Sequence, residues 1–147
     1  MNARGLFASL CVCICGWAAS AAARADIYVI VNAENPQRLL SHKEVVDLFM
    51  GRGRSFSNGE LALAFDLPRD NSVREVFYAS LTGMSASQRN SYWARLMFTG
   101  QTMPPQTLPA EQEVLKIVKR NPSAIGYVSQ EPADRRLRTV FVLKESH

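Results

Sequence analysis

The segment that most constrains the fold is Asp-Ile-Tyr-Val-Ile-Val-Asn at residues 26–32. It is rich in β-branched residues, which favour a strand, and its apolar side chains fall on both faces of that strand. A strand that is apolar on both faces needs cover on both sides, and helices packed against a sheet provide it. The segment therefore predicts a layered α/β fold.

The rest of the chain alternates between helix-like and strand-like segments. Helices are expected where apolar residues recur at helical spacing behind a capping serine, and strands where short apolar runs lie between turn residues. The connections are too long for hairpins, so we expect a small, mostly parallel sheet sandwiched by helices. The expected strands are residues 26–32, 60–67, 124–128 and 138–143, the expected helices begin at Ser41, Ser72, Ser85 and Ala110, and residues 100–109 are expected to form a loop.

Residues 1–25 have the organisation of a secretory signal peptide. Arg4 gives a positive start, residues 6–23 are mostly apolar and small, and Ala-Arg-Ala at residues 23–25 offers a small-x-small cleavage site. A retained transmembrane anchor is the alternative, but Arg24 followed directly by a strand-like segment favours removal. We therefore expect an exported protein, periplasmic or secreted after cleavage.

The mature chain, residues 26–147, would keep 122 of the 147 residues, which suits one α/β domain and is too short for two. Without Arg4 and Arg24, the 17 basic side chains of the chain become 15 against 13 acidic ones, a net charge of +2. So small a charge implies no nucleic-acid partner. All three cysteines lie in the leader, so no disulfide, thiol nucleophile or cysteine metal site remains after cleavage.

The strand-to-helix turn within residues 63–77 is the strongest candidate site. An apolar run ends at Asp66, a polar turn follows, and the next helix carries Ser72 and Arg74 in its first turn. Free N–H groups at a helix start, the helix dipole and a guanidinium favour an anion there, and ligands of α/β sheets bind beyond the carboxyl ends of strands. The structural alternative is that Ser72 and Glu75 form a capping box that serves only their own helix.

The chain offers little for catalysis. Its two histidines, His42 and His147, are far apart, and His42 falls in an expected helix start where we predict that it is exposed. No glycine-rich nucleotide loop or nucleophile elbow is present. Asp66 and Asp70 could approach each other as an acid/base pair, but Asp66 is better explained as a turn residue or the partner of a nearby arginine. We therefore expect no enzyme activity, no metal and no cofactor.

Two further clusters are predicted to be structural. One is an apolar stripe at helical spacing, which is expected to pack into the core. The other is a run of arginines after Asp134, which is expected to form a solvated face. The stripe consists of Tyr92, Trp93, Leu96 and Met97, and the run consists of Arg135, Arg136 and Arg138.

Five short motifs, in order along the chain, carry a resemblance to a known family. They are Leu-Phe-Met-Gly-Arg at residues 48–52, Phe-Ser-Asn-Gly at 56–59, the segment 70–77, Tyr-Trp at 92–93 with Phe-Thr-Gly at 98–100, and Ala-Ile-Gly-Tyr-Val at 124–128. Together they resemble the phosphate-type substrate-binding proteins of ABC transporters, most of all short, single-lobe members of that superfamily. The resemblance implies a single lobe of a type II periplasmic-binding-protein-like fold.

The resemblance also implies a site. In those receptors a segment of the type Arg-x-x-Gly-Ser-Gly-Thr at a helix start donates hydrogen bonds to the oxyanion. Ser72 matches its serine and Asp70 an acidic position just before it, whereas Asn71 stands where glycine is usual and Arg74 takes the threonine position. The implied ligand residues are Ser72, Arg74 and Asn71, with Arg69, one place late for the family's arginine, and Asp70 at the rim.

Two functions remain open at this stage. The first is an exported solute-binding protein of the phosphate ABC transporter type, which binds phosphate or a related oxyanion at the helix start. Because a single lobe leaves such a site open to water, this hypothesis predicts a homodimer that covers it. The alternative is a protein-interaction or sensor-accessory module that docks to an envelope transporter or sensor, which the bulk of Val73 in place of a glycine favours.

Overall fold

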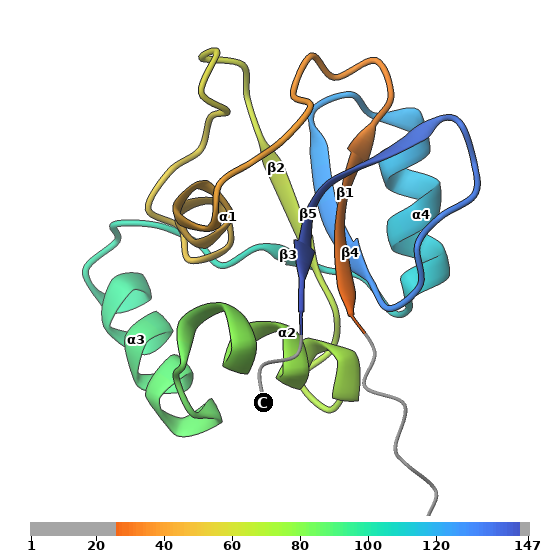
Figure 1. The fold of residues 1–147 in the computed structure, drawn as a ribbon. Coiled ribbons are helices and arrows are strands. Elements are labelled where there is room, and N and C mark those ends of the chain that lie inside the picture. Colours follow the sequence, from red (N-terminus) through yellow and green to blue (C-terminus); the bar gives the residue numbers. More distant parts are fainter. Residues whose placement is uncertain (1–25, 145–147) are drawn as a thin grey trace, which may run out of the picture.

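The computed structural model describes residues 26–144 and places a five-stranded sheet, with strand order β3-β2-β4-β1-β5, at the centre of the fold (Figure 1). The expected α/β fold class is confirmed, and the leader predicted at residues 1–25 lies outside the described residues. The strands are β1 (Ile27–Asn32), β2 (Leu63–Asp66), β3 (Gln106–Thr107), β4 (Ala124–Val128) and β5 (Leu137–Leu143), and the helices are α1 (His42–Phe49), α2 (Ser72–Thr82), α3 (Ala86–Phe98) and α4 (Glu111–Arg120).

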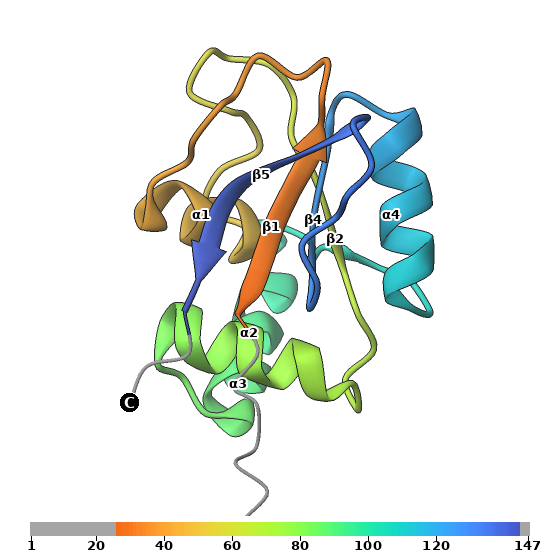
Figure 2. The same ribbon diagram turned by 45° about the vertical axis from the view of Figure 1, so that its right-hand side comes forward.

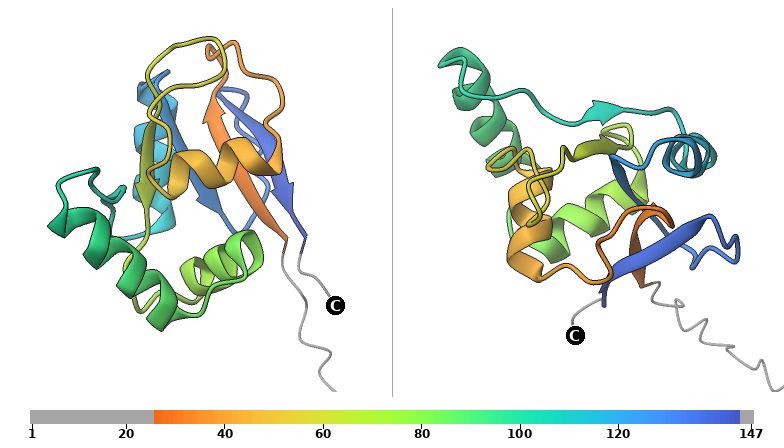
Figure 3. Two further views of the ribbon diagram at one scale, coloured as in Figure 1. Left: turned by 90° about the vertical axis from the view of Figure 1, so that its left-hand side faces the viewer. Right: turned by 90° about the horizontal axis from the view of Figure 1, so that it is seen from above.

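Helices cover both faces of the sheet, as the two-sided apolar character of β1 requires. Helix α4 packs on β4 and β1 from one side, while α1 and α2 lie on the other (Figures 2 and 3). Val29, Ile30 and Val31 are fully buried between these layers. Helix α4 lies close to the sheet at Gly126, where an added Cβ would overlap the side chain of Val114.

The directions of the strands differ from the expectation of a mostly parallel sheet. Strand β2 runs parallel to both β4 and β3, but β1 is antiparallel to both β4 and β5. The sheet is therefore mixed. Long connections exclude hairpins, but they do not fix whether a strand returns in the same direction, because that depends on contacts between residues far apart in sequence.

Two of the four described helices, α1 and α3, are capped by the serine that the sequence predicts. The Ser41 hydroxyl accepts the Glu44 amide while the Glu44 carboxylate accepts the Ser41 amide, which confirms the first capping box. Ser85 and Gln88 form the same arrangement at α3. His42, in the first turn of α1, is exposed, as predicted.

Two structural predictions need correction. In α3, Trp93 is buried, but Met97 is 49% exposed, and Arg89 is buried instead, so the inward face of the helix begins one turn earlier than the apolar stripe suggests. In the arginine run, Arg138 is half-buried and its guanidinium donates to the backbone carbonyls of Asn35, Gln37 and Ala33. Arg138 thus connects the loop after β1 to β5. In this run of arginines, only Arg135 and Arg136 are exposed.

Candidate functional site

The candidate site is the turn that joins β2 to α2 at the carboxyl end of the strand. Leu67 is almost fully buried and anchors the turn, and the amide of Asn71 donates to the carbonyl of Pro68 over 3.0 Å. Strand β2 lies beside β4 here, so the turn meets the end of β4 as well as the start of α2. Three elements thus converge on Asp66, the last residue of β2.

Asp66 is a buried carboxylate surrounded by donors from β4, from α2 and from the turn between β2 and α2. Its Oδ1 accepts the Tyr127 hydroxyl at 2.5 Å and the Leu67 amide at 2.8 Å. Its Oδ2 accepts the Arg74 Nε and the Tyr78 hydroxyl, each at 3.1 Å. A buried charge is stable only when it is paired and hydrogen-bonded, and Asp66 meets both conditions. The interpretation of Asp66 as the partner of a nearby arginine is confirmed.

The titration behaviour of the donors follows from this arrangement. Burial, with the charge of Asp66 and the hydrogen bond to it, raises the pKa of Tyr127 and of Tyr78 far above the ordinary tyrosine value. Burial alone would lower the pKa of Arg74, but its pairing with Asp66 outweighs that effect and raises it. Both phenols therefore stay protonated and donate to Asp66 at neutral pH.

The start of α2 is capped by Asn71, which corrects the expectation of a Ser72 capping box. The Asn71 Oδ1 accepts the Val73 amide at 2.9 Å and the Arg74 amide at 3.3 Å, and Ser72 is the first residue of the helix. Asparagine is at least as good a cap as serine, so the N-cap lies one residue before the predicted one, while the helix spans the predicted residues 72–82. Two of the amide groups that the sequence offered to an oxyanion thus have a partner from their own chain.

The five predicted ligand residues fall into two groups. Arg74 and Asn71 are turned toward their own chain, with the Arg74 side chain only 13% exposed and its Nε on Asp66. Arg69, Asp70 and Ser72 are exposed on the turn, and within residues 26–144 their side chains have no hydrogen-bond partner. The structure therefore places all five on one turn, but only three of them face solvent.

The sequence did not lead us to predict that Tyr78 and Tyr127 belong to the site. Tyr78 lies one helical turn after Arg74, a spacing that could have indicated a shared face. Tyr127 stands at an apolar strand end and gives no sequence signal for its partner, 61 residues away. Its ring stacks on Phe77 with centroids 3.9 Å apart, so the phenol is held by packing as well as by Asp66.

Arg89 extends the same region to α3. Its guanidinium donates to Glu75 at 2.6 Å and to the Met84 carbonyl at 2.8 Å, and it lies over the Tyr78 ring. The pairing fixes α3 against α2. The residue stands four positions before Trp93, on the same helix face, and that spacing is the signal that sequence reasoning overlooked.

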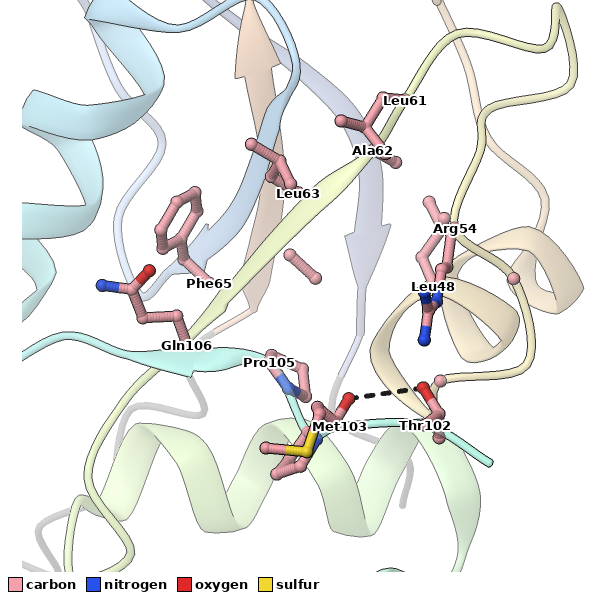
Figure 4. Close-up of a pocket in the computed structure, with 14 residues that line it drawn as sticks. Leu48, Arg54, Leu61, Ala62, Leu63, Phe65, Thr102, Met103, Pro105 and Gln106 are labelled. Atoms are coloured by element: carbon pink, nitrogen blue, oxygen red, sulfur yellow. Dashed lines mark hydrogen bonds between the residues drawn. The ribbon is translucent and has the colours of Figure 1, made fainter. Parts of the chain in front are cut away.

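A cavity of about 410 Å³ lies apart from this turn, along the outer edge of β2. Its walls come from β2, from the loop after α1 and from the segment before β3, and they are mainly apolar (Figure 4). Among its lining residues, all within the described part of the chain, the single charged side chain is Arg54.

Residues 26–144 contain no cluster of three or more histidine, cysteine or acidic side chains that could hold a metal ion. Within the same range, no helix has the length and apolar character needed to cross a membrane.

Comparison with known proteins places the fold. No family model matches the sequence, and no curated protein matches it at a significant level. Among solved structures, the chain is similar to one assigned as a phosphate ABC transporter substrate-binding protein from Clostridium perfringens, with bound phosphate. The TM-score is 0.62 and the sequence identity is 19%. The match covers 79% of this chain and 45% of that one. An ABC-type phosphate transport receptor from Vibrio cholerae gives a TM-score of 0.62 and 14% identity, over 79% and 46% of the two chains.

The chain therefore spans less than half the length of these two structures. At such low identity the likeness shows the fold alone: a mixed five-stranded sheet flanked by helices, as in part of each of these two structures. The resemblance seen in the sequence is supported at that level.

Proposed function

We propose that the protein is an exported, non-catalytic solute-binding lobe of the phosphate ABC transporter type, which binds phosphate or a related oxyanion at the start of α2. The ligand would lie against Ser72, the helix N–H groups and the outer edge of the Arg74 guanidinium, with Asn71 beside it and Arg69 and Asp70 at the rim. The fold shared with a phosphate-bound receptor supports this proposal.

The observation that carries the proposal is the arrangement at the end of β2. Arg74 donates through Nε to Asp66, and its Nη1 lies 3.7 Å from the Glu75 carboxylate, while Ser72 is exposed at the start of the same helix. A cation and an exposed hydroxyl are thus both carried by the first turn of a helix, at the strand end where α/β sheets bind ligands. To reach the Val73 and Arg74 amides, an oxyanion has to displace the Asn71 side chain.

One observation favours a second function. Because Asn71 already accepts those two amides, the helix start is satisfied without a ligand. A lobe with a self-capped helix start fits a protein-interaction or sensor-accessory module of the cell envelope, with a transporter or sensor as its partner. Under this alternative the capped turn is structural, and phosphate does not bind.

Calorimetry of the mature protein with phosphate and sulfate tests the proposal. We expect binding that Ser72→Ala weakens at least tenfold, because that change removes a ligand hydroxyl without touching the Asn71 cap. Ser87→Ala is the matched control, since Ser87 is also an exposed serine in the first turn of a helix. Absence of heat at millimolar phosphate, or equal effects of the two variants, would favour the interaction module.

The remaining parts of the proposal have their own tests. Removal of residues 1–25 on export is checked by N-terminal sequencing of the protein recovered from the periplasm or medium. The homodimer, predicted because a lone lobe leaves the site open to water, is checked by sedimentation with and without phosphate. A monomer under both conditions would contradict that part.

A further inference from the structure

The outer edge of β2 contains a gap in its hydrogen bonds. In a strand, the N–H and C=O of one residue point to the same side, and successive residues alternate. Leu63 donates to Ser123 on the β4 side, so Ala62, Ala64 and Asp66 direct their backbone groups outward.

Two segments of the chain occupy parts of this edge. The Ala62 amide donates to the Arg54 carbonyl at 2.9 Å, and Asp66 accepts the Leu108 amide at 2.8 Å where β3 pairs with β2. Between these contacts lie the Ala62 carbonyl and the Ala64 amide, for which residues 26–144 provide no hydrogen-bond partner. An acceptor and a donor are thus left open, spaced as a parallel strand requires.

The gap opens into the cavity of about 410 Å³, a size typical of ligand pockets. The cavity walls near the gap are apolar, with Leu48, Leu61 and Met103 among them, and Arg54 enters from the side opposite Phe65 and Gln106 (Figure 4). Leu61 is 53% exposed and Met103 is 71% exposed, so both have apolar surface left to cover.

We propose that this gap binds the carboxyl terminus of an extended peptide whose last residue is apolar. The N–H of that residue donates to the Ala62 carbonyl, and one of its carboxylate oxygens accepts the Ala64 amide. The bound peptide runs parallel to β2. Strand β3 already pairs with Phe65 and Asp66, so the edge has no room for a further peptide residue, and the peptide has to end beside the gap. The terminal carboxylate then meets Arg54, and the apolar side chain enters the cavity.

The positive charge of Arg54 favours a peptide's free carboxyl terminus over an internal peptide segment as the bound group. Arg54 is the single charged group among the described residues that line the cavity, and no carboxylate among them balances it. A charge-assisted hydrogen bond to a guanidinium is about twice as strong as a neutral one, so the free acid is preferred over its amide. This mode of β-strand addition uses backbone bonds for affinity and the cavity for specificity.

The probes are the synthetic peptide acetyl-Ala-Ala-Val-Leu with a free carboxyl terminus, its carboxamide, and an analogue N-methylated at the last amide. We expect the acid to bind at least tenfold more tightly than either of the others. Arg54→Gln should remove the preference for the acid over the carboxamide, whereas Arg52→Gln, an exposed neighbour that does not line the cavity, should keep it.

A measurement on the wild-type protein, at an amide of the gap, tests the proposal even if a variant fails to fold. In amide NMR spectra of the wild-type protein, the Ala64 N–H should shift on addition of the acid and stay in place with the carboxamide at the same concentration. Failure of the acid to bind at millimolar concentration, equal binding of acid and carboxamide, or an unmoved Ala64 amide would overturn the proposal. These outcomes leave phosphate binding at α2 unaffected, because the two sites share no residue.

Discussion

The Tyr127 hydroxyl donates to the Asp66 carboxylate over 2.5 Å and so joins the end of β4 to the end of β2 beneath the candidate site. Arg74 and Tyr78, one turn apart on α2, complete the contacts of the same carboxylate. The position of the α2 start, and hence of Ser72, depends on this one buried acid.

Asp66→Asn should destabilise the protein by about 3 kcal/mol, because it removes the buried counter-charge of Arg74 and leaves only the more exposed carboxylate of Glu75, 3.7 Å from the guanidinium. Asp47→Asn is the control: Asp47 pairs with Lys43 on the surface, and loss of such a pair costs about 0–1 kcal/mol. Urea unfolding of both variants gives the comparison. Similar midpoints for the two variants would show that Asp66 does not organise the turn.

Stability should fall in alkali. The pKa values of Tyr78 and Tyr127 are raised above the unfolded value of about 10, so the folded state keeps protons that the unfolded chain releases. The resulting stabilisation is complete below about pH 10 and is lost as pH rises further, by about 1.4 kcal/mol per pH unit for each tyrosine.

Chemical unfolding at a series of pH values above about 10 checks this slope. Tyr127→Phe should unfold with a shallower dependence on pH, because one of the two phenols that keep their proton in the folded state is then gone. An unchanged slope in Tyr127→Phe would contradict the pKa argument.

Gly126→Ala should cost about 1–3 kcal/mol, because the new Cβ overlaps Val114 and forces α4 away from the sheet. Gly53→Ala makes the matched comparison, since a Cβ there meets only Asp47 Cβ at 3.8 Å. Thermal unfolding should therefore separate the two variants clearly. A Gly126→Ala protein as stable as Gly53→Ala would mean that α4 has room to shift.

Asn71→Gly should change stability by only a few tenths of a kcal/mol, because glycine is itself a tolerated cap. The substitution also frees the Val73 and Arg74 amides. In the wild type, phosphate has to displace the Asn71 cap, which costs about 1 kcal/mol. Without that cost, phosphate should bind about fivefold more tightly. Calorimetry measures this change. A weaker or unaltered affinity would show that these amides take no part in binding.

Local pattern was enough to predict much of this fold. Ala124–Val128 matches the predicted strand residue for residue, and the expected strand at 26–32 differs from β1 by one residue, because apolar runs between turn signals are a property of the segment itself. Strand direction was not predictable in the same way, since β1 meets β4 through residues such as Tyr28 and Val128 that are far apart in sequence.

The candidate site shows the same division. A nearby arginine was predicted as a possible partner of Asp66, and it is Arg74, eight residues on, because the turn keeps the two close. Tyr127 was not predicted. The N-cap of α2 was assigned one residue too late because Asn71 and Ser72 are both good caps, and only the backbone geometry of the turn selects between them.

The central claim is that the first turn of α2 receives an oxyanion, and an amide NMR titration of the wild-type protein with phosphate tests it most directly. We expect saturable shifts concentrated at the amides of Ser72, Val73 and Arg74. The first turn of α1, which is capped by Ser41, serves as the internal control and should not respond. Shifts of equal size at both helix starts, or none at Ser72, would contradict the claim.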